Sequence, residues 1–176
     1  MFLNVTIRWD VIFIEILIIL FVMIVVSLIS INILKKCIKA HNLKDWNYII
    51  KHKAVLKQFL RTKKLYNESS YLLAKANFEL SNDEEFMLYV EKIGEKFIAR
   101  KLFLKISYAL IKDNDVSYVN DLKHELGLLK DEESKKCFLV CELLCKMKYE
   151  KYVCTKEELE MIKPYISGRV NQEFLQ

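Results

Sequence analysis

The chain contains few of the residues that interrupt helices. Its 176 residues include only Gly94, Gly127, Gly168 and a single proline, Pro164. Sheet-rich and doubly wound folds need turn residues at their corners, so this scarcity argues against both. It also leaves little loop in which to build a glycine-rich phosphate site or a nucleophile elbow. The sequence therefore predicts an all-α protein with short connections between helices.

Motifs of catalysis and metal binding are also missing. The sequence has no HExxH zinc motif and no CxxC pair, and His41, His52 and His124 lie far apart. Pairs of acids at residues 84–85 and 132–133 fall where helices are expected to begin, and acids there stabilise the helix dipole. We therefore expect no enzymatic activity, no cofactor and no metal.

The five cysteines do not resemble the disulfide framework of a small secreted protein, because their number is odd. Cys137, Cys141 and Cys145 repeat every four residues, so a helix would carry them on one side over ~12 Å. One zinc ion with ~2.3 Å bonds cannot reach all three thiols. We interpret them as small apolar residues of a packing face. Cys37 is either an acylation site or an unmodified thiol.

One long hydrophobic run occupies residues 11–34 and is followed at once by Lys35 and Lys36. As a helix it would be ~36 Å long, enough to cross a hydrocarbon core of ~30 Å. The polar residues of the run are Glu15, Ser27, Ser30 and Asn32. The run is too long for the core of a cleaved signal peptide. It also lacks the polar stripe of a buried soluble helix. We predict a retained transmembrane helix.

Glu15 is the only acid of the run and has two interpretations. An intramembrane carboxylate can pair with a partner helix, since charges inside a bilayer are costly and usually functional. Alternatively, residues 16–34 span ~28 Å without it, which places Glu15 at the interface. The sequence leaves both interpretations open.

Charge is distributed unevenly along the chain. Residues 35–64 hold ten basic side chains and one acid, whereas residues 65–176 hold 17 basic and 20 acidic side chains. Basic residues beside a span stay in the cytoplasm, so we predict an extracytoplasmic tail at residues 1–10 and a cytoplasmic body in a single-pass cell-membrane protein. The ten are Lys35, Lys36, Lys39, Lys44, Lys51, Lys53, Lys57, Arg61, Lys63 and Lys64. This juxtamembrane helix would bind an anionic membrane surface; nucleic acid is an unlikely partner.

The body shows apolar residues at helical spacing in successive segments. Clusters of Asx residues at 81–83 and 113–115 separate some of these segments and favour turns and N-caps. Gly94 and Gly127 are expected to act as left-handed C-caps. Their separation gives a period near 33 residues. The expected helical segments are 43–64, 68–80, 84–94, 96–112, 115–129, 132–150 and 155–167.

Segment 71–93 resembles one tetratricopeptide repeat. Leu73-Ala74 stands where that family has Leu-Gly, and Ala76 stands at its small residue in the first helix. Ser81 occupies the position of the turn glycine. Residues 103–126 look like a more degenerate second copy.

The resemblance implies an α-solenoid of antiparallel helix pairs over residues 65–167, followed by a polar tail at 168–176. An irregular helical bundle is the alternative. In a solenoid the concave face would bind a protein or peptide, with Tyr71, Asn77, Lys101 and Tyr108 as candidate contacts. We expect a membrane-anchored, non-enzymatic scaffold or adaptor. The alternatives are a small subunit of a larger membrane complex that packs through its span, and a nucleic-acid binder that uses the basic helix.

Overall fold

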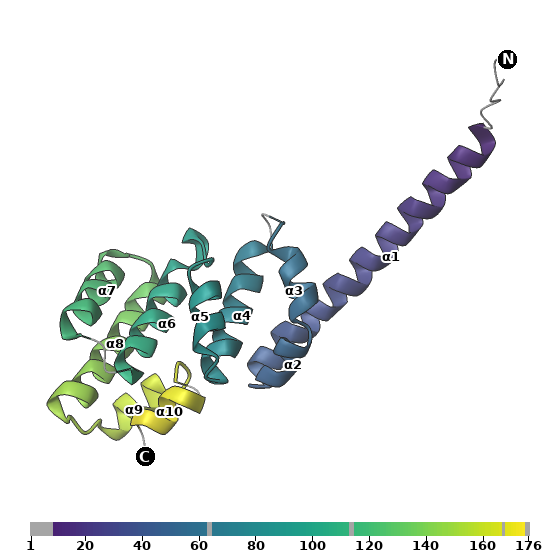
Figure 1. Ribbon diagram of the computed structural model, residues 1–176. Coiled ribbons are helices and arrows are strands. Elements are labelled where there is room, and N and C mark those ends of the chain that lie inside the picture. The colour runs from purple at the N-terminus through teal and green to yellow at the C-terminus, as the bar shows by residue number, and fades with distance from the viewer. Residues whose placement is uncertain (1–8, 63–64, 113–114, 167, 175–176) are drawn as a thin grey trace.

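The computed structural model describes residues 9–62, 65–112, 115–166 and 168–174, and these residues form helices and connections without a strand. A long helix, α1, projects from a body made of shorter helices (Figure 1). This all-helical architecture confirms the coarse prediction from the scarcity of glycine and proline. The elements are α1 (Trp9–Asn42), α2 (Trp46–Lys51), α3 (Lys53–Phe59), α4 (Tyr66–Glu79), α5 (Asp83–Val90), η1 (Glu95–Phe97), α6 (Ile98–Ile111), α7 (Val116–Leu128), α8 (Glu132–Glu150), α9 (Lys156–Ile162) and α10 (Gly168–Phe174).

Helix α1 has an exposed outer part and an inner end that belongs to the body. It is long and apolar enough to cross a membrane, and the most apolar part is not buried against any part of the chain that the structure describes. The inner end differs, because Leu34, Cys37 and Ala40 are buried in the core of the body. These residues recur at three-residue intervals, which places them along one side of the helix. The same helix therefore forms both the candidate span and a wall of the body.

The basic segment 35–64 is not one helix, as the sequence predicted, but is divided among the end of α1, α2 and α3. The break after α1 has a local cause. The amides of Lys44 and Asp45 donate to the carbonyls of His41 and Ala40, at 3.0 and 2.9 Å, which is the hydrogen-bond pattern of a Schellman end. The carboxylate of Asp45 then accepts the amide of Tyr48 at 3.1 Å and begins α2. One residue thus ends the first helix and caps the next.

Helices α4 to α8 pack in order along the chain, with α4 against α5, α6 against α7, and α8 against both α6 and α7. Aromatic rings fill the junction of the first three: Phe86 lies 5.5 Å from Phe78 and 4.9 Å from Tyr108, between ring centroids. Phe78 and Phe86 are fully buried. The solenoid of antiparallel pairs, as a description of this packing, stays a prediction.

The polar clusters between segments begin helices as expected. Asp115 caps α7 by accepting the amide of Ser117 at 3.0 Å. Thr155 and Glu158 form a complete capping box at the start of α9. Asn82 occupies the N-cap position of α5, although its side chain makes no capping bond.

The prediction that glycines supply left-handed C-caps is wrong. Gly94 is extended and precedes η1, and Gly127 lies inside α7. No glycine in the described ranges has a positive φ. The left-handed positions are instead Lys44, Ser81 and Lys151, with φ between 52° and 59°. A helix end can impose this conformation through its hydrogen bonds even when the residue has a Cβ.

The prediction of a polar tail over residues 168–176 is also wrong for its described part. Helix α10 packs against α4, α6 and α8, with Val170 fully buried. Arg169 fixes its start, because its guanidinium donates to the carbonyl of Phe78 and to the carboxylate of Asp83, at 3.1 and 2.9 Å. In Figure 1, α9 and α10 lie across one end of the other helices of the body. Partners some 90 residues away in sequence make this segment part of the fold.

Candidate functional site

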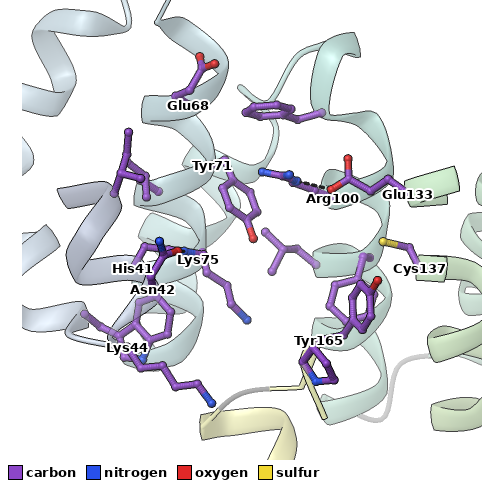
Figure 2. Close-up of a pocket in the computed structure, with 17 residues that line it drawn as sticks. His41, Asn42, Lys44, Glu68, Tyr71, Lys75, Arg100, Glu133, Cys137 and Tyr165 are labelled. Carbon is purple, nitrogen blue, oxygen red and sulfur yellow. Dashed lines mark hydrogen bonds and ion pairs between the residues drawn. The ribbon is translucent and has the colours of Figure 1, made fainter. Parts of the chain in front are cut away.

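A cavity of about 540 Å³ lies between the end of α1 and helices α4, α6 and α8. Figure 2 shows its walls, with α1 and α4 on one side and α6 and α8 on the other. The connector between α9 and α10 contributes Pro164 and Tyr165 and closes one end. The volume is in the range of sites that bind small ligands or a few residues of a peptide. Elements from both ends of the chain therefore build one site.

Aromatic side chains form much of the wall of the cavity. Trp46, Tyr71, Phe97 and Tyr165 line it from four different elements. The ring centroid of His41 lies 5.5 Å from those of Trp46 and Tyr71, and Tyr71 lies 6.1 Å from Phe97. Such rings offer broad apolar contact with a polar edge. The wall suits apolar side chains of a ligand.

The charged residues of the cavity are mostly held in pairs. Arg100 donates from Nε to Glu133 at 2.7 Å, and its guanidinium lies over the ring of Phe97, 4.7 Å from the centroid. Lys75 is 5% exposed and its Nζ lies 2.6 Å from Glu79. Lys44 is exposed and makes no ion pair with a described residue.

Glu68 also lines the cavity. It lies 3.0 Å from Nζ of Lys96, which itself lies outside the lining. The lining as a whole carries three cationic and two acidic residues. Both acids of the wall therefore already hold a cation.

Burial keeps several groups of the cavity neutral. It raises the pKa of Tyr71 to about 12, although the charge of Arg100 opposes the shift. It raises the pKa of Cys137 to about 11, with a further increase from Glu133, and lowers the pKa of His41. At neutral pH the site therefore presents a phenol O–H, a thiol rather than a thiolate, and a neutral imidazole.

Two buried polar atoms of the cavity have no hydrogen-bond partner among the described residues. They are Nε2 of His41 and Oε2 of Glu68. A buried polar atom without a partner costs free energy, on the order of 1–3 kcal/mol.

The structure brings only one of the four candidate contact residues into the cavity. Tyr71 lines it. Asn77 is 1% exposed and donates to the carbonyl of Leu73 at 2.8 Å, so it stabilises the end of α4 and offers no surface to a partner. Lys101 pairs with Glu91 at 3.0 Å, outside the cavity.

Tyr108, the fourth candidate, also lies outside the cavity and packs against the core. Sequence reasoning did not find Arg100, Glu133 or Tyr165 as site residues. Their positions in the chain have no common period or motif that would have signalled a shared site.

The basic segment of α1 to α3 presents a strongly cationic surface. Lys53 pairs with Glu85 at 2.6 Å, whereas seven other basic residues are exposed and make no ion pair within the described ranges. Lys63 and Lys64 lie outside the described residues. The seven are Lys35, Lys36, Lys39, Lys44, Lys51, Lys57 and Arg61.

The cysteines behave as packing residues. Cys137, Cys141 and Cys145 are buried, and burial raises the pKa of each thiol. No group of three or more metal-ligating side chains occurs in the part of the chain that the structure describes. Cys37 is fully buried between α1 and the body, which argues against its acylation. Glu15 lies on the exposed outer part of α1.

Comparisons of the chain with protein-family models, with curated proteins and with solved structures gave no match.

Proposed function

We propose that this chain is a membrane-anchored, non-enzymatic adaptor that docks a segment of a partner protein in the cavity between α1, α4, α6 and α8. The single observation that carries the proposal is the composition of that cavity. Aromatic walls beside charged side chains favour the binding of a segment with mixed side chains. The neutral thiol of Cys137, with a pKa of about 11, is a poor nucleophile, which favours binding over chemistry.

The anchor is supported by the two parts of α1. Its outer part exposes large apolar side chains, a surface that water disfavours and a bilayer accepts. Its inner end buries Leu34, Cys37 and Ala40, so cleavage near the end of the apolar run would cut beside the core of the body. A cleaved signal peptide does not take part in the fold of the mature protein. We therefore propose a retained anchor.

The orientation is proposed from charge. Seven exposed, unpaired basic residues follow the span, and such residues are retained on the cytoplasmic side. The same residues would attract anionic lipids by about 1 kcal/mol each near the surface. The body would then lie in the cytoplasm against the inner leaflet.

Site-specific photo-crosslinking in intact membranes tests the docking site. A photoreactive amino acid replaces Phe97 or Tyr165 in the full-length chain, and the matched control carries it at Val153, which is 84% exposed and does not line the cavity. We expect one discrete adduct of the same mass from both cavity positions and none of that mass from the control. Adducts that are absent from the cavity positions, or identical at all three, would rule out docking in the cavity.

A second candidate function has its own observation. The apolar outer part of α1 makes no contact with the described body, so the span has a free surface for other membrane helices, and Glu15 lies on it. The chain would then be a subunit of a larger membrane complex. Replacement of Glu15 by leucine would dissociate such a complex in mild detergent, whereas Glu15→Gln would retain part of it. An unchanged complex size for both variants would exclude pairing through Glu15.

A further inference from the structure

The cations of the cavity lie in a row that matches an extended anionic ligand. In Figure 2, Arg100 lies at one end, the hydroxyl of Tyr71 points into the middle, and Lys75 and Lys44 follow toward the other end. Arg100 uses Nε for Glu133, and its terminal nitrogens make no bond with a described residue. Lys44 makes no ion pair there either. Both ends of the row therefore offer a charged donor.

The acids offset part of this attraction, because an ion pair neutralises its cation as well as its acid. Glu133 lies 2.7 Å from Arg100, and Glu79 lies 2.6 Å from Lys75. Lys44 makes no ion pair with a described residue, so the lining keeps one unpaired cation. The α1 to α3 segment that contributes Lys44 carries six further exposed basic residues that make no ion pair with a described residue. Their field would repel a basic ligand and attract an acidic one.

A peptide fits the cavity better than a lipid headgroup does. The aromatic wall suits apolar side chains, which a phospholipid headgroup lacks. A peptide backbone supplies donors as well as acceptors. The distance of the cavity from the hydrocarbon core also favours a peptide. Asn42, which lines the cavity, lies eight residues, or ~12 Å of helix, beyond the end of the apolar run. This distance exceeds the ~5–8 Å thickness of one headgroup layer.

We propose that the docked segment is an acidic stretch of a partner protein, bound in extended form with carboxylates at Lys44 and Arg100 and apolar side chains against the aromatic wall. This inference rests on the proposed function and names the class of its partner. The cavity lies so close to the span that about four extended residues, at ~3.3 Å each, reach it from the membrane boundary. A partner in the same membrane is therefore the best placed.

A binding experiment with defined probes tests this chemistry. Full-length chain in phosphatidylcholine nanodiscs is titrated with fluorescein-labelled hexapeptide pools that carry glutamate, glutamine or lysine at alternate positions and mixed residues between. We expect the glutamate pool to bind at least tenfold more tightly than the glutamine pool and the lysine pool to bind most weakly. Equal binding of the glutamate and glutamine pools would overturn the proposal.

Matched variants separate the cavity from the general positive charge. Lys44→Gln and Arg100→Gln should each weaken binding of the glutamate pool about tenfold, and Arg100→Lys should recover part of the loss. Lys51→Gln removes the same charge from α2 without touching the cavity and should change binding less than twofold. An equal loss for Lys51→Gln and Lys44→Gln would overturn the proposal in favour of diffuse attraction. Circular dichroism checks that each variant folds.

A final set of binding measurements distinguishes a peptide ligand from a lipid headgroup. Nanodiscs with 30% phosphatidylglycerol replace the neutral ones, and inorganic phosphate is added separately. Retention of the selectivity for glutamate supports the peptide site, whereas its complete loss in the anionic nanodiscs would assign the cavity to a lipid headgroup. Photo-crosslinks at Phe97 without selectivity for acidic pools would leave the docking function intact and refute only the acidic chemistry.

Discussion

Ser81 adopts a backbone φ of 59°, a value that side chains with a Cβ disfavour. The end of α4 imposes this conformation: the amide of Asn82 donates to the carbonyl of Asn77 at 2.9 Å, and the amide of Ser81 donates to that of Phe78 at 3.2 Å. These two bonds define a Schellman end, in which glycine is the usual residue at the position of Ser81. The resemblance to a tetratricopeptide repeat places the turn glycine at the same position.

Replacement of Ser81 by glycine should therefore stabilise the body. The strain relieved is about 1 kcal/mol, and the midpoint of thermal unfolding should rise by about 2–4 °C. Asn120→Gly is the matched control, because Asn120 is exposed inside α7 and glycine there should lower the midpoint. Circular dichroism in mild detergent measures both. A lower midpoint for Ser81→Gly would contradict the left-handed geometry of this turn.

Asp83 holds two helices at once. Its carboxylate lies 2.6 Å from Lys112 and 2.9 Å from Arg169. Burial alone would raise the pKa of Asp83, but the hydrogen bonds and charges of these two cations outweigh it and lower the pKa. Because the folded pKa is below the unfolded value, the stabilisation is present above about pH 5 and is lost as the pH falls through the folded pKa.

Asp83→Asn should destabilise the fold by about 1 kcal/mol at pH 7. The difference between the original chain and the variant should shrink as the pH falls below about 4, because the carboxylate is then protonated in both folded and unfolded states. Thermal unfolding at half-unit steps from pH 3 to pH 7 measures this difference. A constant difference over the range would show that charge at Asp83 does not contribute.

At the scale of elements, α10 depends on contacts with residues distant in sequence. The amide of Arg169 donates to Oε2 of Glu79 at 3.0 Å, and its guanidinium lies over the ring of Phe78, 5.4 Å from the centroid. A Cβ on Gly168 would lie 2.7 Å from the same Oε2, so a larger residue there would displace this carboxylate. The helix is held at its first turn.

Arg169→Gln should release α10 while the remaining helices persist. Hydrogen exchange of the amides of residues 170–174 should accelerate at least tenfold, because the ion pair with Asp83 and the bond to the carbonyl of Phe78 are lost. Lys163→Gln is the matched control, since its pair with Glu160 is exposed and local. Unchanged exchange in Arg169→Gln would show that buried Val170 alone holds the helix.

The sequence predicted the elements that depend on local signals and missed those that depend on distant ones. Asx residues and acids mark the starts of α5, α7 and α9 within one or two residues, because capping is a local interaction. The left-handed positions were expected at glycines, but a helix end can impose a positive φ on a serine or a lysine. Helix α10 was missed because its polar sequence becomes stable only against α4, α6 and α8.

At the scale of the whole molecule, the proposed orientation predicts the reactivity of one thiol. Cys154 is the most exposed cysteine, since Cys37, Cys137, Cys141 and Cys145 are all buried. An impermeant maleimide at pH 8 should leave Cys154 unlabelled in intact cells and label it after permeabilisation. Burial and the charge of Glu158 raise its pKa, so labelling requires the higher pH.

The matched control for orientation carries Cys154→Ser together with Asn4→Cys. This variant should be labelled in intact cells, because the tail before the span would lie outside. Labelling of Cys154 from outside, together with protection of the cysteine at position 4, would reverse the orientation.

The candidate site was less predictable than the helices. Tyr71 was singled out from its place in a first helix, and Lys44 was singled out for membrane binding. Arg100 and Tyr165 reach the same cavity from α6 and from the connector before α10, which are separated by about 60 residues. Only the packing of α10 and α8 against α6 brings these segments together, and no local pattern encodes that packing.

If α1 crosses a membrane as proposed, its continuity with the body makes the bilayer a determinant of how the body is oriented. An apolar run of ~36 Å fits a hydrocarbon core of ~30 Å if the helix tilts by roughly 30°, and a thicker membrane requires a smaller tilt. Because α1 enters the body without a joint and is buried there at Leu34 and Cys37, the body must turn with it. The angle between the body and the lipid surface would thus change with the thickness of the membrane.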